Sequence, residues 1–259
     1  MQYYIVDAFT SEHFKGNPAG ICLLNEWLED ETMQNIAFEN NLAETAFLMK
    51  EGDGYALRWF TPECEIDLCG HATLASAYIL LNLVDRTRDK VIFHTRSGVL
   101  TVYKDQEKLR MNFPSRKPVA ADIPNGLSKA LGIPIVEAYR SRDLIVLVDR
   151  EETVRNLAPD FELLKQYESF FGIVVTARGD SCDFVSRYFA PNAGLPEDPV
   201  TGSSHSTLIP FWSERLHKTE MFARQLSKRG GCLYCRDCGE RVEISGEAKL
   251  YLSGEIELL

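Results

Sequence analysis

The order of hydrophobic and polar residues along this chain predicts many short strands and few helices. Apolar runs between turn residues predict strands over residues 3–8, 20–24, 90–95, 99–104, 144–148, 172–177 and 184–189, with a glycine–proline loop over 16–19. A helical period appears over residues 31–40, where Met33, Ile36 and Ala37 fall on one face. Residues 154–167 are predicted to be mostly helical. Strands therefore make up most of the predicted elements.

One strand–turn–helix pattern occurs twice. The two segments begin at Arg58, with RWFTPECEIDLCGHATL, and at Arg187, with RYFAPNAGLPEDPVTGSSH. Each has an Arg-aromatic-Phe-x-Pro strand end, then an acidic residue, then a Gly that opens a helix-like run. The two Arg residues lie 129 positions apart in 259, which is the spacing of a duplicated domain. The alternative is two unrelated segments that share a few residue types.

The helix that follows each of these turns is predicted to begin at a glycine, Gly70 or Gly202. The first N–H groups of a helix lack partners within it and lie at the positive end of its dipole. Small residues there let an anion approach the backbone. The two helix starts are therefore candidate binding sites for an anionic group. Ordinary capping by Thr201, Ser203 or Asp198 is the alternative.

Six short motifs occur in a fixed order along nearly the whole chain. They are Gly16-Asn17-Pro18-Ala19, Asn41-Leu42-Ala43-Glu44-Thr45-Ala46-Phe47, Arg58-Trp59-Phe60-Thr61-Pro62, Leu68-Cys69-Gly70-His71-Ala72-Thr73, Glu197-Asp198-Pro199-Val200-Thr201-Gly202-Ser203 and Arg229-Gly230-Gly231. Together they resemble the phenazine-biosynthesis PhzF-like family, which has the diaminopimelate epimerase-like fold.

The resemblance implies an α+β fold of two similar domains made by duplication. Each would be a mostly antiparallel β-sheet or barrel wrapped around a central α-helix, with the active site in the cleft between the domains. A proline-rich stretch over residues 114–134 marks the boundary. We expect an N-terminal domain over residues 1–114, which the C-terminal strand could complete, and a C-terminal domain over 115–259.

The resemblance also implies an isomerase that moves a proton on carbon by acid/base catalysis, without a cofactor, on a small anionic carboxylate. Local sequence alone describes Glu44 as a charge beside an apolar strand, but Glu44 falls on the family's catalytic acid/base. His71 and Asp198 fall on its other catalytic positions. The expected substrate-binding residues are Gly70, His71, Asp198, Gly202 and Ser203.

One cysteine leaves the chemistry open. Cys69 precedes Gly70 where related epimerases of this fold carry a catalytic cysteine, while Thr201 takes the matching place before Gly202. A single-cysteine epimerase or racemase remains possible, since a thiol near a helix start can have a lowered pKa. A buried, unreactive thiol is the simpler interpretation. A catalytically silent binding protein on the same fold is the third alternative.

Composition narrows the range of partners. A formal net charge of −10 argues against a general nucleic-acid-binding surface. The N-terminus MQYYIVDAFTS has neither the basic nor the apolar region of a signal peptide, and no apolar run approaches about 18 residues. We therefore expect a cytoplasmic protein without a membrane partner, and we expect it to form a homodimer.

The seven cysteines are expected to be reduced thiols, because their number is odd and no secretion signal precedes them. The cluster of Cys232, Cys235 and Cys238 lacks a fourth zinc ligand nearby, and its flanks are typical of strands. We expect no metal and no other cofactor.

Overall fold

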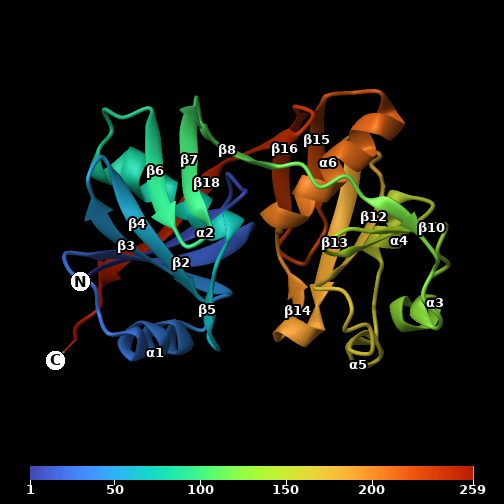
Figure 1. The fold of residues 1–259 in the computed structure, drawn as a ribbon, viewed down its shortest axis with the longest axis horizontal. Helices are drawn as coiled ribbons and strands as arrows, with labels where there is room; N and C mark the ends of the chain where they lie inside the picture. The colour runs from blue at the N-terminus through green and yellow to red at the C-terminus, as the bar shows by residue number, and fades with distance from the viewer. Residues whose placement is uncertain (259) are drawn as a thin grey trace. The chain divides into compact units, whose positions relative to one another are not determined.

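The computed structural model describes residues 1–258, and the chain forms two compact units (Figure 1). Unit 1 consists of Met1–Asn112 together with Ile244–Leu259, and unit 2 consists of Phe113–Glu243. The sequence predicts one boundary after residue 114. In the structure the chain leaves unit 2 again after Glu243, because the last strand pairs with the first one.

The sheet of unit 1 follows the order β18, β1, β2, β3, β4, β6, β7 and β8, with β5 on β4. Neighbouring strands are parallel at β2–β3 and β4–β6 and antiparallel elsewhere. The strands are β1 (Gln2–Ala8), β2 (Asn17–Leu24), β3 (Glu44–Glu51), β4 (Gly54–Phe60), β5 (Glu65–Ile66), β6 (Lys90–Thr95), β7 (Gly98–Asp105), β8 (Lys108–Pro114) and β18 (Ala248–Glu255).

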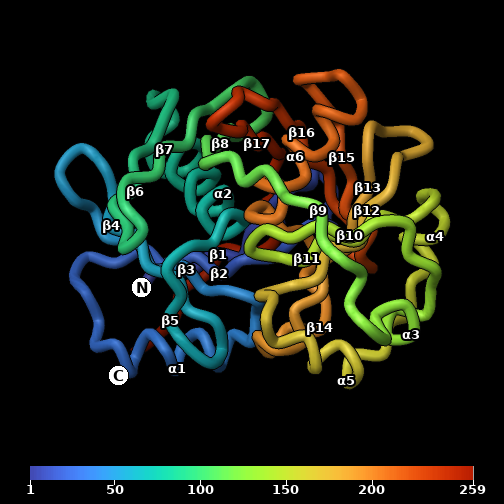
Figure 2. Tube along the Cα trace, turned by 45° about the vertical axis from the view of Figure 1, so that its right-hand side comes forward, coloured from blue at the N-terminus to red at the C-terminus, as the bar shows by residue number. Residues whose placement is uncertain are grey.

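A central helix packs against this sheet. Helix α2 (Gly70–Ile79) continues into a single π-turn, η1 (Leu80–Val84), and contacts β1, β2, β3 and β18 (Figure 2). All of its residues except Tyr78 are buried, as expected of a helix that is apolar on every face. The amphipathic helix α1 (Asp30–Asn40) instead buries only Met33, Ile36 and Ala37.

Unit 2 repeats this plan. Its sheet follows the order β9, β10, β11, β12, β13, β15 and β16, with β14 on β13, and is parallel at β11–β12 and β13–β15. Its central helix is α6 (Gly202–Leu216), which contacts β15 and β16. The strands are β9 (Val119–Ala121), β10 (Glu137–Arg140), β11 (Leu144–Leu147), β12 (Ile173–Arg178), β13 (Phe184–Ala190), β14 (Leu195–Asp198), β15 (Glu220–Gln225) and β16 (Gly231–Asp237). Strand β17 (Arg241–Gly246) begins in unit 2 and ends in unit 1. The shorter helices are α3 (Leu127–Leu131), α4 (Glu151–Arg155), α5 (Phe161–Leu164) and η2 (Pro191–Ala193).

The same ion pair braces the strand before each central helix. Arg58 on β4 makes two hydrogen bonds of 2.7 Å to the carboxylate of Glu65 on β5. Arg187 on β13 makes two, of 2.6 and 2.9 Å, to Glu197 on β14. The paired strand orders and the paired braces confirm the predicted α+β fold of two similar halves.

Two predicted elements are wrong in extent. The predicted helix over residues 154–167 is only α4 and α5, because Pro159 disfavours helical backbone at Ala158 and Asp160 starts a new helix by accepting from Glu162 N and Leu163 N. Residues 17–19 of the predicted loop over 16–19 are instead the start of β2. Pro18 fits there because β2 has only β1 as a neighbour until Ala19 pairs with Glu44.

Candidate functional site

Three side chains of unit 1 meet around the ring of His71. The Nε2 atom of His71 lies 3.0 Å from Glu44 Oε2. Its Nδ1 atom lies 3.1 Å from Asn17 Nδ2 and 3.4 Å from Cys69 Sγ. His71, Asn17 and Cys69 are buried, and only 14 % of the Glu44 side chain is exposed. The ring is thus held between a carboxylate on one edge and an amide and a thiol on the other.

The fold explains why residues so distant in sequence meet here. Asn17 and Glu44 begin the neighbouring parallel strands β2 and β3, whose ends on this side lie next to the start of α2. Cys69 is the N-cap residue of α2, with extended backbone at φ −139°, and His71 is the second residue of the helix. Two strand starts and one helix start therefore converge on one point.

Burial and charge set the protonation of this group. Burial, together with the charge of Glu44, raises the pKa of the Cys69 thiol to about 11, so the thiol is neutral near pH 7. Burial alone would lower the pKa of His71, but the adjacent Cys69 and Glu44 groups outweigh it and hold that pKa well above its ordinary value. The ring of His71 thus lies between two titratable neighbours that favour its protonated form.

Glu44, Cys69 and His71 are also the one group of potential metal ligands found within residues 1–258, with ligand atoms within 4.8 Å of one another. Their arrangement does not fit a shared ion. Cys69 contacts Nδ1 and Glu44 contacts Nε2, and an imidazole binds an ion through one nitrogen. The arrangement suits the movement of a proton.

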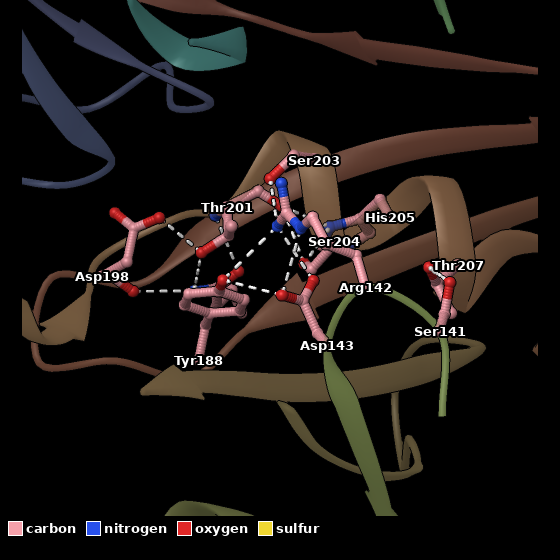
Figure 3. A network of polar contacts seen from close by, with 11 residues as sticks. Ser141, Arg142, Asp143, Tyr188, Asp198, Thr201, Ser203, Ser204, His205 and Thr207 are labelled. Carbon is pink, nitrogen blue, oxygen red and sulfur yellow. Dashed lines mark hydrogen bonds and ion pairs between the residues drawn. The ribbon is translucent and has the colours of Figure 1, made fainter. Parts of the chain in front are cut away.

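The start of α6 in unit 2 is built from Asp198 and Thr201 (Figure 3). Thr201, the N-cap residue, donates from Oγ1 to Asp198 Oδ2 at 2.5 Å. The buried Gln225 of β15 accepts from Thr201 N at 2.9 Å and donates to Asp198 O at 2.7 Å. These bonds fix the Asp198 carboxylate immediately before Gly202.

Beside them, a charged network reaches Ser203. Arg142 donates to the Ser203 hydroxyl at 3.1 Å and to both carboxylate oxygens of Asp143. Tyr188 donates its hydroxyl proton to Asp143 Oδ1 at 3.1 Å, and Asp143 is buried (Figure 3). Because Ser203 accepts from Arg142, its own proton is directed toward another acceptor.

The same kind of hydrogen bond is made separately at each of the two helix starts. Thr73 Oγ1 donates to the carbonyl of the N-cap residue Cys69 at 2.5 Å. His205 occupies the matching place in α6, and its Nδ1 lies 2.8 Å from the carbonyl of Thr201. A carbonyl only accepts, so Nδ1 of His205 carries the proton. Burial lowers the pKa of His205 to about 4. The bond to the Thr201 carbonyl indicates a structural role for this residue.

The structure thus brings the predicted site residues together in two groups. Glu44, Gly70 and His71 lie together in unit 1, and Asp198, Gly202 and Ser203 lie together in unit 2. The sequence interpretation missed the contacts of Asn17, Arg142 and Gln225. Asn17 lies in a recognised motif, but nothing local signals that Arg142 or Gln225 would reach a helix start. The catalytic and binding roles assigned to the six predicted residues stay predictions.

Comparison with known proteins places the chain. The family model for phenazine biosynthesis-like protein, PhzC-PhzF, matches residues 6–254. This chain belongs to the PhzC-PhzF family. The resemblance of the sequence motifs to the PhzF-like family is thereby confirmed, and so is the predicted fold class.

Members of the PhzC-PhzF family resemble the chain over its full length. An uncharacterized isomerase of Pseudomonas aeruginosa is 50% identical over 253 residues, which cover 98% of this chain and 97% of that protein. A crystal structure of a PhzF-family phenazine biosynthesis protein from Enterococcus faecalis has a TM-score of 0.97 at 51% identity, covering 99% of each chain. A predicted epimerase of Pseudomonas aeruginosa, at 18% identity and a TM-score of 0.76 over 100% of this chain and 99% of that one, shares the fold. The names of the similar proteins confirm the isomerase assignment at that level of detail.

No helix within the described residues is long and apolar enough to cross a membrane.

Proposed function

We propose that this chain is a cofactor-independent isomerase that moves a proton on carbon of a small carboxylate substrate, with Glu44 as the acid/base. The observation that carries the proposal is the contact of 3.0 Å between Glu44 Oε2 and His71 Nε2, in a largely buried position at the start of α2. Moving a proton on carbon needs a base near the C–H bond and a group that stabilises the carbanion or enolate. Glu44 supplies the base.

His71 supplies the stabilisation in this proposal. As an imidazolium it can donate a hydrogen bond and place positive charge next to the carbon that loses its proton. The charge of the carbanion or enolate would then develop beside a cation in a buried position, where electrostatic interactions are stronger than in water.

The helix starts supply donors for the substrate carboxylate. The first N–H groups of α2 and α6, at Gly70 and at Gly202 and Ser203, have no partner within their own helix. The Ser203 hydroxyl, which accepts from Arg142, adds a donor at the second of these starts. Asp198, fixed by Thr201, would accept from an amino or hydroxyl group of the substrate. That one substrate engages both helix starts stays a prediction.

A single-cysteine epimerase is less well supported. A cysteine acts as a base in its thiolate form, and burial raises the pKa of Cys69 to about 11. The thiol is therefore protonated under neutral conditions. The contact of Cys69 with His71 Nδ1 also directs the sulfur to the ring edge opposite Glu44.

Deuterium exchange tests the proposal. The protein is incubated in D2O with a panel of amino acids, hydroxy acids and cyclic unsaturated carboxylates, and NMR detects deuterium wash-in at carbon. Glu44→Gln keeps the shape of the side chain but cannot shuttle a proton, so wash-in should fall by a factor of about 100 or more. Glu51→Gln is the matched control, because Glu51 is the exposed last residue of the same strand.

The contrary outcomes are distinct. Near-full turnover in Glu44→Gln, with loss in Cys69→Ser, would establish the cysteine epimerase. Binding of a carboxylate by calorimetry without exchange of any carbon-bound proton would identify a silent binding protein.

A further inference from the structure

Asn17 lies in the Gly16-Asn17-Pro18-Ala19 motif, and the proposed function leaves it without a role. Its side chain is fully buried, and its Nδ2 lies 3.1 Å from His71 Nδ1 across 54 positions of sequence. The backbone fixes this placement. Gly16 has a φ of +66°, and a Cβ there would lie 2.2 Å from the carbonyl oxygen of Ala8, so no other residue fits. The chain therefore delivers Asn17 to one defined position.

The titratable groups that face His71 within unit 1 are Glu44 from β3 and Cys69 from the start of α2. Asn17 from β2 is the uncharged neighbour, and it is on the Nδ1 edge of the ring. Glu44 is on the opposite edge. A contact at Nδ1 therefore leaves Nε2, on the edge that faces Glu44, available to gain or lose a proton.

An asparagine amide suits this task because it offers both kinds of hydrogen-bonding atom. When the ring is neutral with its proton on Nε2, Nδ1 is an acceptor and pairs with the amide N–H. When the ring is an imidazolium, Nδ1 is a donor and pairs with the amide oxygen. The two arrangements differ by a half-turn of the amide group, in which nitrogen and oxygen exchange places within nearly the same volume.

We propose that Asn17 is a positioning residue that holds the His71 ring in one orientation in both of its protonation states by turning its amide over. This inference rests on the proposed function for its catalytic meaning. The geometry itself concerns the free protein. His71 can then gain or lose a proton at the edge that faces Glu44 without losing its place in the site.

NMR of the wild-type protein tests the amide directly. The ring nitrogens of His71 are assigned by comparison with His71→Gln, and the protein is titrated from pH 5 to 10. The side-chain amide signals of Asn17 should shift with the same midpoint as the His71 ring. Asn17 amide signals that stay constant through the His71 titration would overturn the proposal.

Two variants test the energetic coupling. Asn17→Leu keeps the approximate volume but removes the acceptor, so the pKa of His71 should fall by about one pH unit or more. Asn17→Asp supplies a permanent acceptor with a negative charge, so the pKa should rise by a similar amount. Asn82→Leu is the control, because Asn82 bonds to Tyr78 O at the far end of the central helix. Equal His71 titrations in all four proteins would refute the inference.

Activity separates this inference from the proposed function. In active protein, the pH dependence of deuterium wash-in should move with the His71 pKa, which a purely structural role of Asn17 would not cause. If no carboxylate exchanges but the Asn17 and His71 signals still titrate together, the proposed function fails and the positioning role stands.

Discussion

One residue at each helix start bonds to the carbonyl of the N-cap residue, and the two residues do so with different side chains. Thr73 and His205 both bind the carbonyl of the N-cap residue, at Cys69 and Thr201. Threonine does so without a titratable group. Histidine brings a ring whose folded pKa is about 4 against an ordinary value of 6.5. The bond to the N-cap carbonyl therefore involves a titratable group in α6 and none in α2.

We predict that His205 weakens the fold in acid. The unfolded chain takes up a proton at this residue near pH 6.5, whereas the folded chain does so only near pH 4. Stability is therefore complete above pH 6.5 and falls as the pH drops toward 4, by about 3 kcal/mol in total. In His205→Thr, which can keep the bond as Thr73 does, this loss should disappear. Urea unfolding of both proteins at pH 7.5 and 5 measures the difference.

The comparison is made between proteins, so every other titrating group cancels. His71 acts in the opposite direction, since its raised pKa stabilises the fold at lower pH. Equal acid sensitivity in wild type and His205→Thr would contradict the prediction.

A second prediction concerns the turn before β2. Gly16→Ala should lower the free energy of unfolding by more than Gly52→Ala does, and should also reduce deuterium wash-in. Both glycines have positive φ, of +66° and +52°, which costs an alanine about 1–2 kcal/mol. Only Gly16 also lacks room, since its Cβ would lie 2.2 Å from Ala8 O, while nothing lies within 4 Å at Gly52. Denaturant unfolding of the two variants separates steric contact from backbone strain, and equal losses would show that the lack of room does not matter.

At the scale of elements, helix α6 contains a proline, and another segment replaces the hydrogen bond that this proline removes. Pro210 has no N–H group, so it leaves the carbonyl of Ser206 without its usual partner in the helix. The N–H of Arg116, in the segment before β9, donates to that carbonyl at 2.9 Å. The proline thus makes an attachment point for another segment of unit 2.

We predict that Pro210→Ala stabilises the protein by clearly less than the roughly 3 kcal/mol by which proline disfavours a helix interior. The new N–H would compete with Arg116 for one carbonyl, so the helix gains what the attached segment loses. Hydrogen exchange should show faster exchange of the Arg116 amide in this variant. A full gain in stability with unchanged exchange at Arg116 would show that the attachment is not coupled to the proline.

The elements also show which parts of the fold and of the site the sequence can predict. The repeated motif predicts both helix starts, since the Arg–Glu braces and the glycines that open α2 and α6 are all local to it. Glu44 and His71 could be selected by resemblance, and their contact could not be derived from spacing. Arg142 and Gln225 were out of reach, because a loop charge and a strand amide reach Ser203 and Thr201 only through the packing of unit 2. The failed helix over residues 154–167 is a different case, because Pro159 and the N-cap residue Asp160 are local signals that outweigh the helical pattern.

At the scale of the whole molecule, unit 1 is made of both ends of the chain, and unit 2 lies between them in the sequence. Strand β18 lies at the end of the sequence but pairs with β1 along Gln2–Ala8. Figure 1 shows this red strand among the blue strands of unit 1. The first unit therefore depends on the last residues of the chain.

We predict that a protein shortened to end at Gly246 is damaged in unit 1 and not in unit 2. Without β18, the amides of β1 that face it lose their partners and should exchange with solvent far faster. Trp59 of unit 1 and Trp212 of unit 2, both buried, report on the two halves separately after replacement of the other tryptophans by Phe. Equal loss of protection in both units would contradict the prediction.

The expected homodimer stays a prediction, and light scattering on the eluting protein would decide it.

The pairing of β1 with β18 also governs what happens while the protein is being made. The residues of β1 leave the ribosome before those of unit 2, and those of β18 follow only after all of unit 2. At about 5–20 residues per second, β1 waits roughly ten to fifty seconds with one edge open. An open strand edge invites pairing with other chains. Of the two units, the one whose synthesis begins earlier is completed later, and the edge of β1 stays open on the ribosome until then.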